Sequence, residues 1–306
     1  MSQESSPGTA PTESAALVPR IAERGIVVNS LRIATAMSDA PRDLPARVPL
    51  VVLPEAGFVW RDYALILDRF APERRVFALD WPGFGASAKP APSDFSYSTE
   101  NYANLLSDWL DTLGIARAVL LGNGVGAAAA LRYAVAHPSR VLGFALVAPL
   151  GFAQSGMVRG LARRLIDSQF LLRRIEPLAT SLLLGPTTPD VTSSAHRHRE
   201  LRAAPDHAAS IQALATLSRS LAASEPDLSM LASQITAPSL VLRGALDPLV
   251  TAAEAHRAAT TIGAHGALEV TLPDAGHLPF LQQPDRFQQA LAGLIGTAES
   301  ATTQLS

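Results

Sequence analysis

The 306-residue chain contains no cysteine, which excludes disulfides, thiolate nucleophiles and cysteine-based metal sites. It has a single lysine, Lys89, among 25 Lys and Arg residues, and its formal net charge is −2. It has no basic stripe and no alternation of aromatic residues with arginine, so we expect no nucleic-acid partner. The longest apolar stretch, residues 116–136, is interrupted by polar residues and glycines, so we expect no transmembrane segment.

The first twenty residues also lack something: a charged region followed by an apolar one, as in a signal peptide. They are rich in Ser, Thr, Pro and Ala, which predicts a disordered tail. The missing leader and missing cysteine favour a cytoplasmic protein. Apolar residues make up 48% of the chain, enough for one large α/β domain with an insertion or for two small domains.

Strand-like and helix-like segments alternate along most of the chain. After a predicted hairpin at 25–37, strands are expected at 48–53, 75–79, 118–121, 141–147, 239–243 and 268–272. Helices are expected at 59–70, from Ser98 or Thr99 to Gly114, and at 125–136, 252–262 and 280–295. This order predicts an α/β fold with a mostly parallel sheet and helices on both of its faces.

The alternation lapses between residues 149 and 235, where Arg and Leu recur closely and no strand pattern is found. We interpret this segment as a helical cap over the carboxyl edge of the sheet. The predicted organisation is therefore a tail (1–20), a core (21–149 and 236–297), a cap (150–235) and a flexible C-terminal tail (298–306).

Three segments that follow predicted strands contain either a side chain suited to catalysis or a tight turn that could position one. The first, at residues 119–127, reads VLLGNGVGA between a strand and a helix. The second, at residues 243–248, reads RGALDP and contains Asp247. The third, at residues 274–279, reads DAGHLP and contains His277. Ligands of open parallel sheets bind beyond the carboxyl ends of the strands, so all three segments fall where a site is expected.

In this order the three segments resemble the α/β-hydrolase superfamily, and the resemblance covers residues 25–295 outside the cap. It implies that residues 122–126 form the nucleophile elbow, usually G-x-S-x-G, with Gly124 at the nucleophile position. It further implies that Asp247 is the acid and His277 the base of the triad. A glycine cannot attack a carbonyl, so Gly124 excludes a serine acyl-enzyme.

A second departure lies after the first buried strand, where the family usually reads L-H-G-x. This chain reads Leu53-Pro54-Glu55-Ala56, which aligns Ala56 with a backbone donor of the oxyanion hole. We expect Ala56, Asn123 and Val125 to line the oxyanion site and pocket, with Glu55 beside them. A carboxylate there opposes the charge of a tetrahedral intermediate, so two features of acyl transfer are altered together.

Two functions remain open. The first is a cofactor-free enzyme in which His277, oriented by Asp247, acts as general base, on the substrate or on a water where the serine is missing. Glu55 would assist, and the substrate would be a small, mostly apolar molecule undergoing hydrolysis, elimination or isomerisation. The second is a non-catalytic pseudo-hydrolase that binds a small molecule or a protein. In that case Gly124 relieves the strain of the elbow after catalysis was lost.

Other polar residues receive structural interpretations. Asp62 and Asp80 are predicted turn residues, and Glu55 could instead be a solvated loop residue. The cap histidines His196, His198 and His207 lack acidic or cysteine partners at ligand spacing, so we predict no metal site. A third route, in which another serine such as Ser87 supplies the nucleophile, has no support in the sequence. The oligomeric state is not predicted.

Overall fold

The computed structural model describes residues 21–38, 47–152, 169–224, 227–263 and 266–303. Its strands form one eight-stranded sheet in the order β1-β2-β4-β3-β5-β6-β7-β8. Their bounds are β1 Ile21–Val28, β2 Leu31–Ser38, β3 Leu50–Leu53, β4 Val76–Leu79, β5 Ala118–Asn123, β6 Val141–Val147, β7 Ser239–Gly244 and β8 Leu268–Leu272. The pairs β1–β2 and β2–β4 are antiparallel and all others are parallel, which confirms the predicted fold class.

The predicted hairpin is the antiparallel edge of this sheet. Val28 pairs with Leu31 across a turn formed by Asn29 and Ser30. Both turn residues have positive φ, 49° and 66°, as the two-residue turns that match the twist of paired strands require. Asn is among the residues that tolerate this conformation best, which explains its place in the turn.

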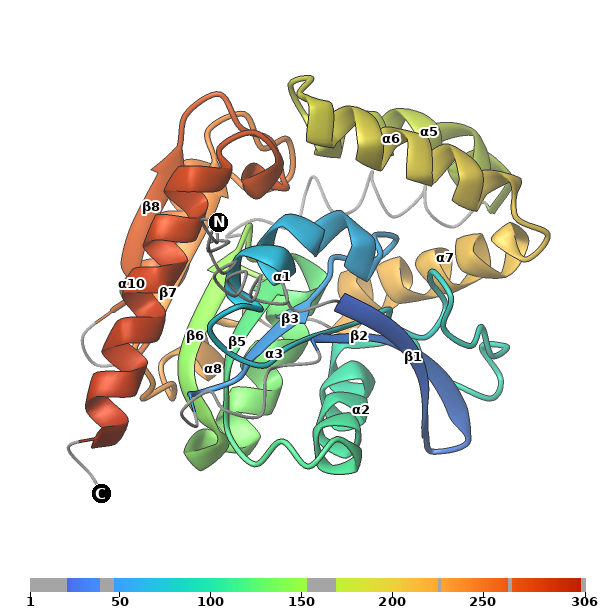
Figure 1. Ribbon diagram of the computed structural model, residues 1–306. Coiled ribbons are helices and arrows are strands. Elements are labelled where there is room, and N and C mark those ends of the chain that lie inside the picture. Colours follow the sequence, from blue (N-terminus) through green and yellow to red (C-terminus); the bar gives the residue numbers. More distant parts are fainter. Residues whose placement is uncertain (1–20, 39–46, 153–168, 225–226, 264–265, 304–306) are drawn as a thin grey trace, which may run out of the picture.

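Helices cover both faces of the sheet (Figure 1). On one face α1 (Ala64–Phe70) contacts α10 (Pro284–Thr303). On the other face α2 (Thr99–Thr112), α3 (Val125–Ala136), α8 (Ser229–Ala232) and α9 (Ala252–Thr261) follow one another in contact. Because both faces are covered, β3 and β5 are buried along their whole length, and their apolar residues form the centre of the core.

Helices α5 (Gln169–Leu184), α6 (Pro189–Ala203) and α7 (His207–Ser224) lie between β6 and β7 in the chain. Figure 1 shows α5 and α6 as a layer above the core, and we call α5, α6 and α7 the cap. Residues 153–168 of the predicted cap lie outside the described residues. Helix α8, which falls in the predicted cap range, instead packs on the core with α3 and α9.

The C-terminal segment differs from the prediction. A short 3-10 helix, Pro279–Leu281, comes first, and α10 begins only at Pro284. Proline is tolerated in the first turn of a helix but not in its interior, so Pro284 divides the predicted helix 280–295. Helix α10 then continues to Thr303 with Ala298 fully buried, so residues 298–303 are not the predicted flexible tail. Residues 1–20, the other predicted tail, lie outside the described residues.

No helix in the described ranges combines the length and the hydrophobicity needed to cross a membrane.

Candidate active site

The order of the strands brings the predicted site residues together. β3 and β5 are neighbours, so the loop after Leu53 lies beside the bend at Gly124. β7 and β8 are also neighbours, and the loops that follow them carry Asp247 and His277. All four loops leave the same edge of the parallel sheet, the edge at which such sheets bind ligands.

The bend at Gly124 has the close packing of a strand-to-helix elbow. Gly124 has φ 49° and ψ −109° and lies between the end of β5 at Asn123 and the start of α3 at Val125. A Cβ at Gly126 would lie 2.2 Å from the carbonyl oxygen of Leu53, and one at Gly122 would lie 2.5 Å from Cα of Ala127. Both flanking glycines are therefore required because the strand and the helix pass too closely for side chains.

The carboxylate of Glu55 fills the space that a side chain at residue 124 would occupy. A Cβ built on Gly124 would lie 1.5 Å from Oε2 of Glu55 and 2.5 Å from its Cδ. The backbone N–H of Ala56 donates to Oε1 at 2.5 Å, and that of Val125 donates to Oε1 at 3.3 Å and Oε2 at 3.2 Å. Ala56, the predicted oxyanion donor, and Val125, predicted to line the same site, thus bind the protein's own carboxylate, which occupies the place in which we expected a water.

His277 lies between two carboxylates. Its Nδ1 is 2.9 Å from Oδ2 of Asp247, and its Nε2 is 3.1 Å from Oε2 of Glu55. Burial alone would lower the pKa of His277, but the hydrogen bonds and charges of Asp247 and Glu55 outweigh burial and raise that pKa to about 9. At neutral pH the ring is therefore an imidazolium that donates to both carboxylates, so it holds a proton and does not accept one.

Asp247 is fixed by its own turn as well as by the histidine. Its Oδ1 accepts hydrogen bonds from the backbone N–H groups of Leu249 at 2.8 Å and Val250 at 3.1 Å. Burial raises the pKa of Asp247, but the hydrogen bond and charge of His277, with the two backbone donors, lower it below its ordinary value. Asp247 is thus a carboxylate that holds the imidazole ring and its positive charge in place.

Tyr63, which sequence analysis did not select, supports the Glu55 loop. Its hydroxyl accepts from the backbone N–H of Glu55 at 2.9 Å and donates to Oδ1 of Asn123 at 2.8 Å. Asn123 in turn donates to the carbonyl of Val147 at 3.1 Å. The side chain of Asn123 therefore braces the loops on either side of it. The indole of Trp81 adds a bond to the carbonyl of Pro54 at 2.8 Å.

The loop of His277 is tied to the end of α5. The backbone N–H of His277 donates to the carbonyl of Leu183 at 3.1 Å. The side chain of Gln282 donates to the carbonyl of Leu184 at 2.5 Å and accepts from the backbone N–H of Gly276 at 3.3 Å. A displacement of α5 would therefore pull on the backbone that presents the imidazole.

Ser87 is held inside its own loop. Its hydroxyl donates to the carbonyl of Asp80 at 2.6 Å and accepts from the backbone N–H of Ala34 at 2.8 Å. The carboxylate of Asp80 accepts from the backbone N–H groups of Trp60 and Ala86, consistent with the turn role predicted for it. Burial raises the pKa of Asp80 to about 7, although both backbone donors lower it. Ser87 thus has a structural role, and its contacts do not support it as a replacement nucleophile.

Asp62 joins the core to the cap. Its fully buried carboxylate accepts from the hydroxyl of Ser194 at 2.6 Å and lies 3.2 Å from Nε2 of His198, both on α6. The Nε of Arg197 is 3.6 Å away, and the backbone N–H of Val59 donates at 3.0 Å. Burial raises the pKa of Asp62, but the bond and charge of His198, with the other partners, lower it overall. Asp62 is thus more than the turn residue we predicted.

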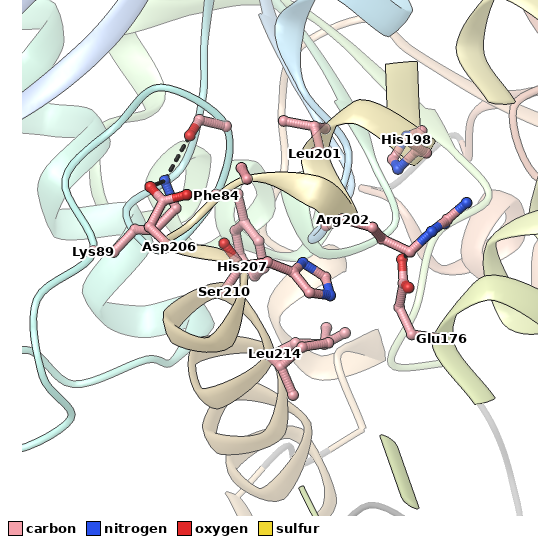
Figure 2. Close-up of a pocket in the computed structure, with 14 residues that line it drawn as sticks. Phe84, Lys89, Glu176, His198, Leu201, Arg202, Asp206, His207, Ser210 and Leu214 are labelled. Carbon is pink, nitrogen blue, oxygen red and sulfur yellow. Dashed lines mark hydrogen bonds and ion pairs between the residues drawn. The ribbon is translucent and has the colours of Figure 1, made fainter. Parts of the chain in front are cut away.

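A pocket with a volume of about 80 Å³ lies between the cap and two core loops. Figure 2 shows His207 in this pocket, between the Lys89–Asp206 ion pair and the side chains of Arg202 and Glu176. Burial lowers the pKa of His207. The pocket reaches Gly57, but its lining includes neither Glu55 nor His277.

Among the residues that the structure describes, no group of three or more His, Cys, Asp or Glu side chains could hold a metal ion.

Comparison with curated proteins gives partial matches. A (lyso)-N-acylphosphatidylethanolamine lipase from Bos taurus is 30% identical over 152 residues, 48% of this chain and 44% of that protein. The 2-hydroxymuconate semialdehyde hydrolase of Pseudomonas sp. (strain CF600) is 34% identical over 122 residues, 39% of this chain and 42% of that protein. The matches thus span less than half the length of these relatives.

Solved structures match over nearly the whole chain. A bacterial membrane phospholipase A gives a TM-score of 0.73 at 21% identity, over 91% of this chain and 87% of that one. The enol-lactonase from Burkholderia xenovorans LB400 gives a TM-score of 0.69 at 23% identity, over 89% of this chain and 100% of that one. These likenesses show the fold, and because residues 19–290 also match the alpha/beta hydrolase family, the chain belongs to that family.

Proposed function

We propose that this protein is an enzyme that works without a serine nucleophile and uses Glu55, His277 and Asp247 for chemistry on a small, mostly apolar molecule. The observation that carries the proposal is the 3.1 Å contact between Oε2 of Glu55 and Nε2 of His277, made where an elbow side chain is absent. The chain itself supplies an acid and a base, so the proposal needs no cofactor.

The charge on His277 changes the role that we predicted for it from the sequence. In the resting site the imidazolium is a general acid, because a group whose pKa is about 9 keeps its proton at neutral pH. The carboxylate of Glu55 is the basic partner, and Asp247 holds the ring. His277 becomes a base only after the negative charge of Glu55 has been removed or displaced.

Ordinary ester hydrolysis through the elbow is not part of this proposal. Gly124 offers no nucleophile, and the backbone donors of Ala56 and Val125 already bind Glu55. The names of the relatives, which include a lipase, a hydrolase and a lactonase, support a hydrolytic reaction. Elimination and isomerisation use the same acid and base and remain within the proposal.

The second candidate is a pseudo-hydrolase that binds a ligand without turnover. It is favoured by the burial of the site: His277 is fully buried, and the carboxylate of Glu55 blocks the oxyanion donors. In this case Glu55 is a permanent internal ligand, and a pocket such as the one that contains His207 would bind the partner molecule.

Turnover measurements separate the two candidates. Purified wild type, Glu55→Gln and His277→Ala would be assayed with small aryl esters, lactones and β-hydroxy ketones. The proposal predicts turnover in the wild type and a loss of at least about 100-fold in each variant. Glu269→Gln is the matched control, because Glu269 forms an exposed pair with His256 away from the site. Variants as active as the wild type would contradict the proposal.

A covalent serine probe gives a second readout. A fluorophosphonate should not label the wild type, because position 124 has no hydroxyl. Labelling at any serine would restore ester hydrolysis as the leading interpretation.

A further inference from the structure

Tyr63 is buried between the loops that form the site, and we infer that it is a positioning residue, which sets where the carboxylate of Glu55 lies against His277. It acts through Glu55 and exchanges no proton itself. The inference rests on the proposed function, because the contact that Tyr63 holds is the one between the acid and the base of that proposal.

Tyr63 contacts three of the segments that form the site. Its hydroxyl accepts from the backbone N–H of Glu55 at 2.9 Å, in the loop after β3. The same hydroxyl donates at 2.8 Å to Oδ1 of Asn123, the last residue of β5. Its ring centroid lies 4.8 Å from that of Phe280, three residues after His277. One side chain therefore spaces the loop of Glu55 from both of the others.

The direction of each hydrogen bond around Tyr63 is fixed by its neighbour. The side-chain nitrogen of Asn123 donates to the carbonyl of Val147 at 3.1 Å, so Oδ1 of Asn123 faces Tyr63. A carbonyl oxygen can only accept, so the hydroxyl proton of Tyr63 points to Asn123 and its lone pairs face the N–H of Glu55. Because all three residues are buried, removal of the hydroxyl leaves both an unpaired donor and an unpaired acceptor.

The peptide unit between Pro54 and Glu55 is held on both sides. Its carbonyl accepts from the indole of Trp81 at 2.8 Å, and its N–H donates to Tyr63. In a trans peptide these two groups point in opposite directions, so the two bonds fix a plane that one bond would allow to turn. A turn of this plane would change the direction in which the side chain of Glu55 leaves the backbone. Tyr63 and Trp81 thus orient Glu55 through its backbone.

The hydrogen bonds to the carboxylate do not replace this restraint. Ala56 donates to it at 2.5 Å, but Ala56 belongs to the same loop and moves with Glu55. Val125 donates from outside the loop, at 3.2 and 3.3 Å, which are long distances for an N–H to carboxylate bond. Without the hydroxyl of Tyr63, we therefore expect the carboxylate to lie farther from His277.

Tyr63 is neither an acid nor a base at neutral pH. Burial raises the pKa of its hydroxyl well above the ordinary value, the bond from the backbone of Glu55 lowers that pKa, and the charges of Glu55 and Asp62 raise it. The hydroxyl therefore keeps its proton throughout the range in which His277 titrates. Its effect on His277 is one of position.

Tyr63→Phe tests the inference, and Tyr102→Phe is its matched control. Tyr102 is also fully buried, and its hydroxyl donates to the carbonyl of Pro82 at 2.9 Å. Phenylalanine at residue 102 keeps the ring that stacks on Trp81. Both variants lose one buried hydrogen bond or more, so both should lower the urea midpoint of unfolding. Only Tyr63→Phe should also affect His277.

The pKa of His277 can be measured without a substrate. The chain has seven histidines and four tyrosines, so protein labelled with ¹⁵N in histidine and ¹³C in tyrosine gives few NMR signals. Burial lowers the pKa of His277, but Asp247 and Glu55 outweigh it and raise that pKa to about 9. A more distant Glu55 lowers it again. We expect a decrease of at least about 0.5 in Tyr63→Phe and a change within about 0.2 in Tyr102→Phe.

Turnover gives a second readout with any substrate that the assays above identify. Tyr63→Phe should lower kcat at least about 10-fold and change KM little, because a misplaced Glu55 impairs the reaction more than binding. Tyr102→Phe should retain the kcat of the wild type. A wild type without turnover would reject the proposed function alone, since the comparison of the two variants by NMR would still decide the role of Tyr63.

Three results would overturn the inference. An unchanged pKa of His277 in Tyr63→Phe would mean that Glu55 keeps its place without the hydroxyl. Equal decreases in both variants would mean that the loss of any buried hydroxyl loosens the site. If Tyr63→Phe does not fold, the wild type decides: the ¹³C signal of Cζ of Tyr63 should titrate together with His277, and that of Tyr102 should not. A Tyr63 signal that ignores this titration is the third contrary result.

Discussion

Among the described residues, two carboxylate–histidine pairs are buried, and their arrangements are opposite. In the site, the cation of His277 lies between two anions, Asp247 and Glu55, all carried by core loops. At the cap, the anion of Asp62 lies among several donors, of which His198 and Ser194 come from α6. The first arrangement holds a proton between two carboxylates of the core loops. The second fastens a core loop to α6 of the cap.

Of the variants that disrupt these pairs, the one without His277 should lose the most stability. His277→Ala leaves Asp247 and Glu55 as buried carboxylates without their cation, and we expect a loss of about 3–5 kcal/mol in the free energy of unfolding. Urea denaturation at pH 7 measures it. The double variant His277→Ala/Glu55→Gln should recover part of the loss, because one uncompensated charge is gone. A loss below about 1 kcal/mol would mean that the imidazole is not charged in the folded protein.

The pH dependence of the free energy of unfolding distinguishes the two pairs, because they stabilise the protein in different pH ranges. The pKa of His277 is raised from 6.5 to about 9, so its contribution is complete below pH 6.5 and is lost as pH rises through 9. This shift corresponds to about 3 kcal/mol. The pKa of Asp62 is lowered, so its contribution is present above pH 3.8 and is lost as pH falls below that value.

The variant Glu55→Gln tests whether the loss of stability at alkaline pH comes from His277. Denaturant unfolding from pH 3 to pH 10 should show that the variant loses less stability than the wild type between pH 6.5 and 9, because one cause of the raised pKa of His277 is absent. The part of the acid range that comes from Asp62 should be unchanged, since the variant leaves its partners in place. Asp80, with a pKa of about 7, titrates equally in both proteins and cancels in the difference. Equal losses of stability in the wild type and the variant between pH 6.5 and 9 would contradict a contribution of Glu55 to the raised pKa of His277.

Asp62→Asn breaks the second pair and should have a smaller effect. The amide keeps the shape but weakens the bonds to His198 and Ser194, and we expect a loss of about 1.5–3 kcal/mol. Hydrogen exchange should increase in α6 and remain unchanged in α3, because Asp62 fastens the cap. Equal changes in both helices would show that Asp62 stabilises the core and not the junction.

The exposed pair of His256 and Glu269 sets the lower limit of the comparison. Its side chains are 69% and 29% exposed, so solvent screens their 2.9 Å contact. Glu269→Gln should change the free energy of unfolding by less than about 1 kcal/mol. A larger loss by urea denaturation would show that burial does not explain the ranking of the three pairs.

Much of the core could be predicted from the sequence. Apolar runs bounded by turn residues located β6, β8 and α3 at the bounds that the structure has. The tight bend between β5 and α3 was located from its glycines, whose packing requirement is local. Where prediction failed, as at Pro284, a single residue ended one element and began another within a periodic apolar pattern.

The site was only partly predictable, for a geometric reason. The sequence places Glu55 near the oxyanion loop, but only the neighbouring position of β3 and β5 brings its carboxylate onto Gly124. Strand order is not a local property, and neither is the contact of Asp62 with His198, 136 residues apart. One local signal was available: a residue without a side chain at 124 together with a long acidic one at 55.

That pairing has a consequence for substitution at either position. A side chain at position 124 would require the carboxylate of Glu55 to move, since the Cβ would lie 1.5 Å from Oε2 in its present position. Gly124→Ser alone should therefore be harmful, and Glu55→Gly alone should leave a buried cation with one counter-ion, although the two together are compatible. A change between a hydroxyl at the elbow and a carboxylate from the neighbouring loop therefore involves positions 124 and 55 together.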